Sequence, residues 1–117
     1  MNNRKWYCLT AVLLLSLFLT SCDQQKIADI NADPGSFHNK EVQIGGEVTQ
    51  SIGALGKGVY QLNDGSGSLW VYSDKLGVPS RGAKVGVKGT VLPTFAFLGT
   101  NYATVVKEED RHSVKGN

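Results

Sequence analysis

The feature that most limits how this chain can fold is the alternation of apolar residues with other residues, broken at intervals by glycine. Between residues 84 and 92 the alternation is strict, with Val85, Val87 and Val91 on one side of the chain. Successive side chains of a β-strand point to opposite faces, so a two-residue period collects these valines on one face. The stretch is therefore predicted to be a half-buried strand and not an amphipathic helix.

The same pattern predicts five strands, at residues 41–51, 58–64, 68–73, 84–92 and 101–107. The pair Gly45-Gly46 would bend the first strand, and the Asp-Gly-Ser-Gly sequence that begins at Asp64 predicts a tight turn between the second and third. A closed sheet has no exposed edges to invite aggregation. We therefore expect an all-β fold, a small five-stranded Greek-key barrel.

The N-terminus carries positive charge followed by a short apolar run. Arg4 and Lys5 precede apolar residues 9–19, a run shorter than the roughly 20 residues of a transmembrane helix. This order is typical of a secretory signal peptide. The run ends in a sequence that resembles the lipobox of bacterial lipoproteins, Leu19-Thr20-Ser21-Cys22. The resemblance implies cleavage before Cys22 and acylation of its thiol, which would anchor the mature chain in a membrane. The alternative is an ordinary secretory signal with a chance cysteine.

The two residues after the cysteine, Asp23 and Gln24, resemble the signal that retains enterobacterial lipoproteins in the inner membrane. We therefore expect a lipid anchor in the bacterial cell envelope, at the inner membrane and facing the periplasm. The expected organisation is a signal peptide at residues 1–21, a lipid-anchored lead-in segment at 22–40, the barrel at 41–108 and a charged, frayed tail at 109–117. A short helical turn is predicted near Lys26 to Ile30, ended by Pro34.

Residues 42–91 carry a pattern that resembles the OB-fold, in particular the anticodon-binding type of OB domain. An opening strand with central glycine is followed by Val59-Tyr60-Gln61-Leu62-Asn63-Asp64, then by the hairpin turn and Leu69-Trp70-Val71, and later by Gly82-x-Lys84-Val85-x-Val87-x-Gly89-x-Val91. The chain differs from the family in leaving little room for a helix between the third and fourth strands. The resemblance implies binding over the outer face of the second and third strands.

Alternation assigns the side chains of these two strands to the two sides of the barrel. Tyr60, Leu62, Leu69 and Val71 are expected inside. Ser68 is expected to point outward, together with the residues of the ligand-binding face, which are Val59, Gln61, Asn63, Trp70 and Tyr72. Trp70 and Tyr72 could stack on a base or a sugar ring. Alternatively, the lead-in segment or the loop at residues 93–100 folds over them.

Two further groups are candidate contacts. Lys84 and Lys88 share the outer face of the fourth strand and could touch phosphates. Phe95, Phe97 and Leu98 lie in a predicted loop or extension at residues 93–100. There they would dock a protein partner, dip into the bilayer near the anchor, or plug one end of the barrel. Without Arg4 and Lys5, the 12 basic residues fall to ten, equal to the 10 acidic residues. This balance gives no support to nucleic-acid binding.

Catalytic and metal-binding patterns are not found. His38 and His112 lie near opposite ends of the mature chain, and Cys22, the one cysteine outside the leader, is the expected lipidation site. No metal, no cofactor and no enzymatic activity are expected. The predicted function is a membrane-anchored binding or adaptor module for an envelope protein or glycan. The alternative is a single-stranded nucleic-acid binder, and salt dependence would separate the two.

Overall fold

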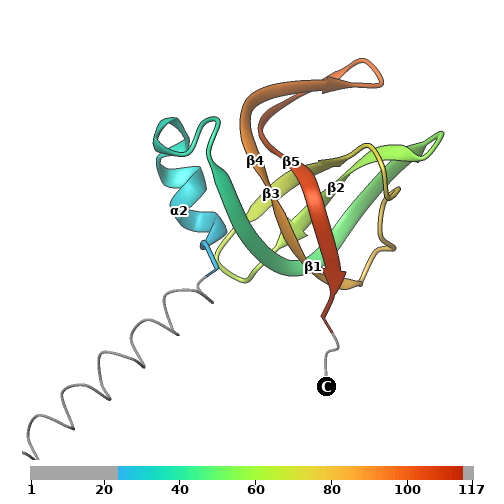
Figure 1. Cartoon of the computed structure of the whole chain (residues 1–117), viewed down its shortest axis with the longest axis horizontal. Coiled ribbons are helices and arrows are strands. Elements are labelled where there is room, and N and C mark those ends of the chain that lie inside the picture. The colour runs from blue at the N-terminus through green and yellow to red at the C-terminus, as the bar shows by residue number, and fades with distance from the viewer. Residues whose placement is uncertain (1–23, 115–117) are drawn as a thin grey trace, which may run out of the picture.

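The computed structural model describes residues 24–114, so the predicted lipobox and Asp23 lie outside the described residues. The described elements, in chain order, are α2 (Ile27–Ala32), the short 3-10 helix η1 (Pro34–Ser36), β1 (Glu41–Ala54), β2 (Lys57–Asn63), β3 (Ser68–Ser73), β4 (Lys84–Phe97) and β5 (Thr100–Ser113) (Figure 1).

The five strands close into one barrel in the order β1-β2-β3-β5-β4, with β4 pairing back to β1. β3 and β5 run parallel, and the other neighbouring pairs are antiparallel. The predicted all-β, five-stranded barrel is thus confirmed.

The barrel interior is filled by the residues that alternation places inside. Tyr60, Leu62, Leu69 and Val71 are all buried, as are Val85, Val87 and Val91 of β4. They belong to one core cluster with Val42, Ile44 and Val48 of β1. The two-residue period of the sequence therefore assigned the core of these strands correctly.

β1 pairs with two other strands, and a glycine in β1 allows both pairings. The strand pairs with β4 over its first half and with β2 from Glu47 onward. A Cβ on Gly46 would lie 2.2 Å from the carbonyl oxygen of Asn63, a distance no side chain can occupy. The strand runs unbroken through the glycines, and its register shift falls later, between Val48 and Gln50.

The lead-in segment is part of the folded domain and not a slack tether. Ile27 and Ile30 of α2 are fully buried in the core cluster, where they close one end of the barrel (Figure 1). The helix ends before Pro34, as predicted. Residues 74–83, which connect β3 to β4, form no helix. The helix that covers the core is α2, which precedes β1 in the chain. The predicted lead-in boundary at residue 40 is therefore wrong for the region from Gln25 onward, whose amide already bonds Gln43 at 2.7 Å.

Residues 93–100 were predicted to be an apolar loop or an extension, and the structure shows the extension. β4 continues to Phe97, β5 begins at Thr100, and only Leu98 and Gly99 form the turn between them. We call the part of this hairpin that projects beyond the barrel, residues 92–104, the β4–β5 ribbon. Pro93 favoured a loop in the sequence, but Leu92 pairs with Val105 and Thr94 with Ala103, so the proline is accommodated within the ladder.

The prediction of a frayed tail is wrong for residues 109–113. β5 extends to Ser113 and pairs with the first half of β4, where Val85 lies opposite Ser113. Glu108, the first of three adjacent acidic residues, is only 6 % exposed. The domain therefore reaches five residues beyond the predicted boundary at residue 108.

Candidate binding surface

The outer face of β2 and β3 presents Trp70 and Tyr72 as the alternation predicts. Trp70 lies opposite Gln61 and Tyr72 opposite Val59 in the β2–β3 ladder. Both aromatic side chains are half-buried, although they point away from the barrel interior. Something outside the barrel must therefore cover them in part.

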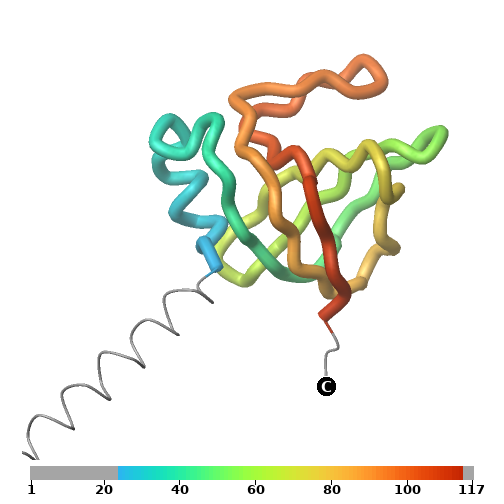
Figure 2. The backbone as a smooth tube through the Cα atoms, viewed as in Figure 1, coloured from blue at the N-terminus to red at the C-terminus, as the bar shows by residue number. Residues whose placement is uncertain are grey.

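That cover is the β4–β5 ribbon. Phe95 pairs with Tyr102 across the ribbon, so these rings and Phe97 share one of its faces. The Tyr102 ring lies 4.9 Å from that of Trp70, and the Phe95 and Phe97 rings lie 4.1 and 6.2 Å from that of Tyr72. Figure 2 shows the ribbon bending over the barrel. The five rings form an aromatic cluster on the outside of the barrel, so the expectation that Phe95 and Phe97 plug the barrel end is wrong.

The ribbon bends where β4 and β5 leave the barrel. Thr104, opposite Pro93, has a backbone φ of +53°, a conformation that disfavours a β-branched residue. Proline on one strand and a left-handed residue on the other break the regular extension of the ladder. The bend directs the aromatic face of the ribbon onto Trp70 and Tyr72.

The other predicted members of the outer face differ in accessibility. Val59 has no exposed surface, so its assignment to the ligand-binding face is wrong; it lies beside Tyr72, beneath the aromatic cluster. Gln61 is half-buried and accepts a hydrogen bond from Thr49. Asn63 bonds Ser68 and Gly65 within the β2–β3 turn. Leu98 is 66 % exposed at the tip of the ribbon.

Lys84 and Lys88 lie on another part of the barrel. Both are on the half of β4 that pairs with β1, opposite Glu47 and Gln43. The Lys88 ammonium lies 3.7 Å from the carboxylate of Glu41. Lys84 lines an open cavity of about 510 Å³ beside Lys26, Glu47 and Asp64. The structure therefore does not bring the two lysines together with Trp70 and Tyr72.

A turn between β2 and β3 holds α2 in place. The Asp64 carboxylate accepts hydrogen bonds from the amides of Ile27 (2.9 Å), Ser66 (2.8 Å) and Gly67 (3.2 Å). The Ser66 hydroxyl accepts one from the amide of Ala28. Burial by itself raises the pKa of Asp64, but the hydrogen bonds outweigh it and the pKa is lowered. The sequence predicted the turn; the contact with the helix, 37 residues away, was not predicted.

A buried polar network, which the sequence analysis missed, lies inside the barrel wall. Glu108 accepts hydrogen bonds from Tyr60 (2.5 Å), Ser73 (2.9 Å) and Arg111 (3.2 Å). The Arg111 guanidinium also donates to the carbonyls of Leu76 and Gly77. Burial, and then the hydrogen bond and charge of Glu108, raise the pKa of the Tyr60 hydroxyl. The available signal was Tyr60 itself, because a tyrosine at an inward position requires a polar partner.

The histidines and metal-binding groups give no further site in the part of the chain that is described. His38 follows η1, and His112 lies in β5 with its imidazole over Gly86. Among residues 24–114 no three histidine, cysteine or acidic side chains gather closely enough to hold a metal ion. Within the same residues, no helix is long and apolar enough to cross a membrane.

A closed five-stranded barrel with this strand order, and with its third and fifth strands parallel, has the architecture of an OB fold. Solved structures agree. The chain is similar to an asparaginyl-tRNA synthetase from Pyrococcus horikoshii complexed with asparaginyl-adenylate (TM-score 0.64, 17 % identity, covering 82 % of this chain and 23 % of that one). It is also similar to a putative aspartyl-tRNA synthetase from Leishmania major (TM-score 0.62, 17 % identity, covering 82 % and 22 %).

A third similar structure is an OBody bound to hen egg-white lysozyme, with a TM-score of 0.60, 17 % identity, and coverage of 81 % of this chain and 98 % of that one. The chain thus spans less than a quarter of each synthetase but nearly the whole OBody. No protein-family model matches the sequence, and neither does any curated protein. At this identity the similarities establish an OB-like fold, as the sequence predicted, and no more.

Proposed function

We propose that the mature protein is a lipid-anchored OB-fold binding module of the bacterial envelope, with an envelope protein or glycan as ligand and no catalytic activity of its own. The observation that carries the proposal is the aromatic cluster of Trp70, Tyr72, Phe95, Phe97 and Tyr102, whose members all keep part of their surface exposed. Partly exposed rings offer stacking and apolar contact to a protein or a sugar.

The charge around this cluster supports an uncharged ligand surface. Residues 89–106, which include the whole β4–β5 ribbon, contain no charged side chain. The lysines that could contact phosphates, Lys84 and Lys88, lie on the part of the barrel that faces β1. Beside the rings a phosphate backbone would find Lys107, which pairs with Tyr72, but neither Lys84 nor Lys88.

The proposed anchor depends on Cys22, and it is tested in the full chain. The chain is produced in a bacterial host that is fed radiolabelled palmitate. Label on the chain, lost in Cys22→Ala together with membrane association, is the expected result. An unlabelled chain that is released into the periplasm would remove the lipid anchor from the proposal.

Binding is tested on the mature protein through its single tryptophan, Trp70, because the other tryptophan, Trp6, is in the leader. Peptidoglycan fragments are titrated while the Trp70 emission and amide NMR spectra are followed at low and high salt. For glycan binding we expect changes at Trp70, Tyr72 and the ribbon that persist in high salt. Changes elsewhere on the barrel would contradict the assignment of this surface.

A second candidate function, single-stranded nucleic-acid binding, is favoured by the similarity in fold to two tRNA synthetases. The same titration with a single-stranded oligonucleotide tests it. Phosphate contacts release counterions, so their binding weakens steeply with added salt. Oligonucleotide-induced changes at Trp70 that disappear in high salt would favour this candidate over the glycan or protein ligand.

A further inference from the structure

Three turns of the barrel contain the same dipeptide, a leucine followed by a glycine. They are Leu55-Gly56 between β1 and β2, Leu76-Gly77 after β3, and Leu98-Gly99 at the tip of the ribbon. All three glycines have positive φ, of 79°, 69° and 80°. The leucines are 101 %, 54 % and 66 % exposed, respectively. Each turn therefore presents an apolar side chain to solvent.

Two of these leucines have an unfavourable backbone conformation as well. Leu55 and Leu98 have φ values of +56° and +50° at the first position of two-residue hairpin turns. Asparagine, aspartate and glycine are the residues favoured at this position. A leucine in this backbone conformation is strained, and its side chain gains no burial among the described residues. The fold therefore does not explain why leucine occupies these two positions.

The three turns lie at the same end of the barrel. Gly58, just after the β1–β2 turn, pairs with Ser73 at the end of β3, from which the Leu76 turn follows. A Cβ on Gly58 would lie 2.6 Å from Val78, so the loop after Leu76 lies against the base of the β1–β2 hairpin. The ribbon passes over Trp70 at Tyr102 and over Tyr72 at Phe97, so it also runs toward that end.

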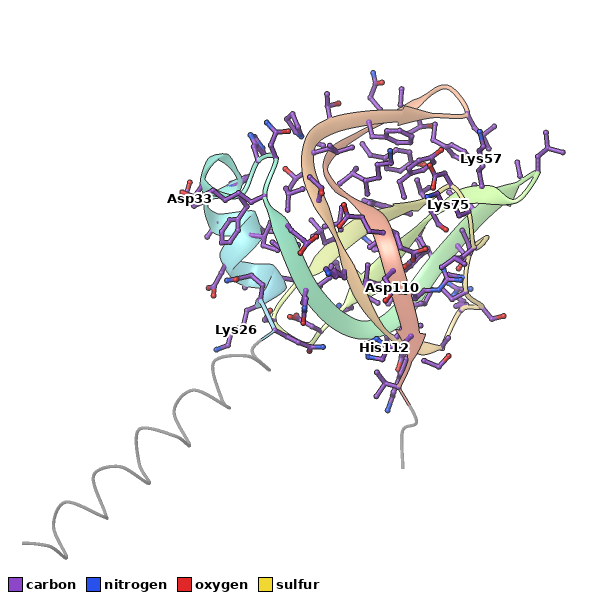
Figure 3. The ribbon with its side chains drawn as sticks, viewed as in Figure 1. Lys26, Asp33, Lys57, Lys75, Asp110 and His112 are labelled. Carbon is purple, nitrogen blue, oxygen red and sulfur yellow. The ribbon has the colours of Figure 1, made fainter. Side chains whose placement is uncertain are left out.

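The rim of this end is slightly basic. Lys57 follows the Leu55 turn, and Lys75 precedes Leu76 with Asp74 beside it. Figure 3 shows Lys57 and Lys75 on the same side of the barrel, away from Lys26. The β1–β2 hairpin tip and the ribbon contain no acidic residue. The positive charge of Lys57 and Lys75 around the exposed leucines is complementary to a binding partner with acidic side chains around an apolar centre.

The N-terminal end of the described chain lies at the other end. Gln24 lines a cavity with Asn63, the last residue of β2, and Asp64, which follows it. From Asn63 back to Lys57 the strand spans about 20 Å at roughly 3.3 Å per residue. With the proposed anchor at Cys22, the three leucines would point away from the anchoring membrane.

We propose that Leu55, Leu76 and Leu98 form a docking surface for a partner protein of the envelope, one that offers apolar pockets bordered by acidic side chains. This inference rests on the proposed function, because an anchor at Cys22 would direct the three leucines away from the membrane. Their binding partner would then be a protein and not a bilayer. The surface adds to the aromatic cluster, since Leu98 is on the same ribbon as Phe95 and Phe97.

The test uses the full chain in its own host cells, with the photoreactive residue benzoyl-phenylalanine in place of Leu76. The variant L55N/L98N removes two leucines and replaces them with a residue that the turns favour, so the fold is kept. We expect a cross-linked product with one polypeptide, identified by mass spectrometry, and a loss of about tenfold or more in L55N/L98N, since each leucine contributes contact area. Val114→Asn, an exposed apolar residue next to Lys84, is the control and should leave the product unchanged.

Three results would overturn the docking surface. The first is the absence of a cross-linked protein, and the second is a cross-linked protein whose yield L55N/L98N leaves unchanged. The third is cross-linking to lipid together with flotation of the purified domain on vesicles of phosphatidylglycerol and phosphatidylethanolamine. A second variant carries the photoreactive residue in place of Gln61, on the outer face of β2. If a partner is cross-linked there and not at position 76, the proposed function as a binding module stands and only the leucine docking surface is refuted. Failure of Cys22 labelling removes the anchor and leaves the cross-linking result standing.

Discussion

The hydroxyl of Tyr60 donates a hydrogen bond of 2.5 Å to the carboxylate of Glu108, 48 residues further along the chain. This contact joins β2 to β5, and Ser73 brings β3 to the same carboxylate. Arg111 neutralises the charge and holds the loop after β3 by its carbonyls. One acidic side chain thus fixes three strands and a loop.

Glu108→Ala should lower the free energy of unfolding by about 3 kcal/mol, because it leaves buried Tyr60 and Ser73 without an acceptor and Arg111 without its counter-charge. The neighbouring Glu109→Ala is the control, because Glu109 is exposed and should change stability by no more than about 0.5 kcal/mol. Urea unfolding followed by Trp70 fluorescence measures both. Equal effects of the two substitutions would mean that the network does not contribute to stability.

The part of the fold that the sequence predicted is the part that local periodicity determines. Val85, Val87 and Val91 could be assigned to the core because a strand has a two-residue period, and Tyr60 and Leu62 followed by the same reasoning. The outward direction of Trp70 and Tyr72 also followed from it. Their cover by residues 93–100 was one of the alternatives left open, and the period could not select it, because the cover depends on how far another hairpin extends.

The errors all concern residues whose partners are distant in sequence. Pro93 and the glycine at position 99 favoured a loop, yet Phe95 and Phe97 alternate as a strand requires, and Tyr72 provides the surface on which they pack. Glu108 is the first of three adjacent acidic residues, a pattern typical of a solvated tail. Its burial is made favourable by Tyr60 and Ser73, which other strands contribute, and by the charge of Arg111.

Asp64→Asn should loosen α2. Asp64 accepts the amide of Ile27, and the helix has no side-chain cap of its own at Lys26. Both carboxylate oxygens of Asp64 accept hydrogen bonds, one from the helix and the other from the turn, whereas asparagine has a single acceptor oxygen. Loss of one of these contacts costs about 1 kcal/mol at neutral pH. Asp74→Asn, in the loop after β3, is the control. Urea unfolding, with hydrogen exchange of the amides of α2, measures the effect, and unchanged exchange would contradict the capping role.

The pH dependence of this effect follows from the lowered pKa of Asp64. A carboxylate with a lowered folded pKa contributes stability above its unfolded pKa of about 3.8, and the contribution is lost as the pH falls through the lower folded value. The difference in stability between the wild type and Asp64→Asn should therefore be full at neutral pH and shrink below about pH 4. A difference that does not vary with pH would show that the charge of Asp64 is not involved.

Tyr102→Ala should uncover Trp70 and shift its fluorescence emission to longer wavelength, because the two rings are 4.9 Å apart and the tyrosine shields the indole from water. The loss of this aromatic pair also costs about 1 kcal/mol of stability. Tyr102→Phe keeps the ring and should leave the emission in place. The control is Asn101→Ala, an exposed residue on the other face of the ribbon. An unshifted emission in Tyr102→Ala would mean that Trp70 is shielded by other groups.

Thr104→Gly should leave stability unchanged or raise it by up to about 1 kcal/mol, although glycine normally weakens a strand. The backbone of Thr104 has φ of +53°, where a β-branched residue is strained and glycine is not. Thr94→Gly, in the same ribbon opposite Ala103, should lower stability by roughly 0.5–1 kcal/mol through backbone entropy alone. In urea unfolding, the free energy of unfolding should therefore fall in Thr94→Gly and stay the same or rise in Thr104→Gly. Equal losses at both positions would mean that the bend of the ribbon costs nothing at Thr104, and that Pro93 alone directs the aromatic face onto the barrel.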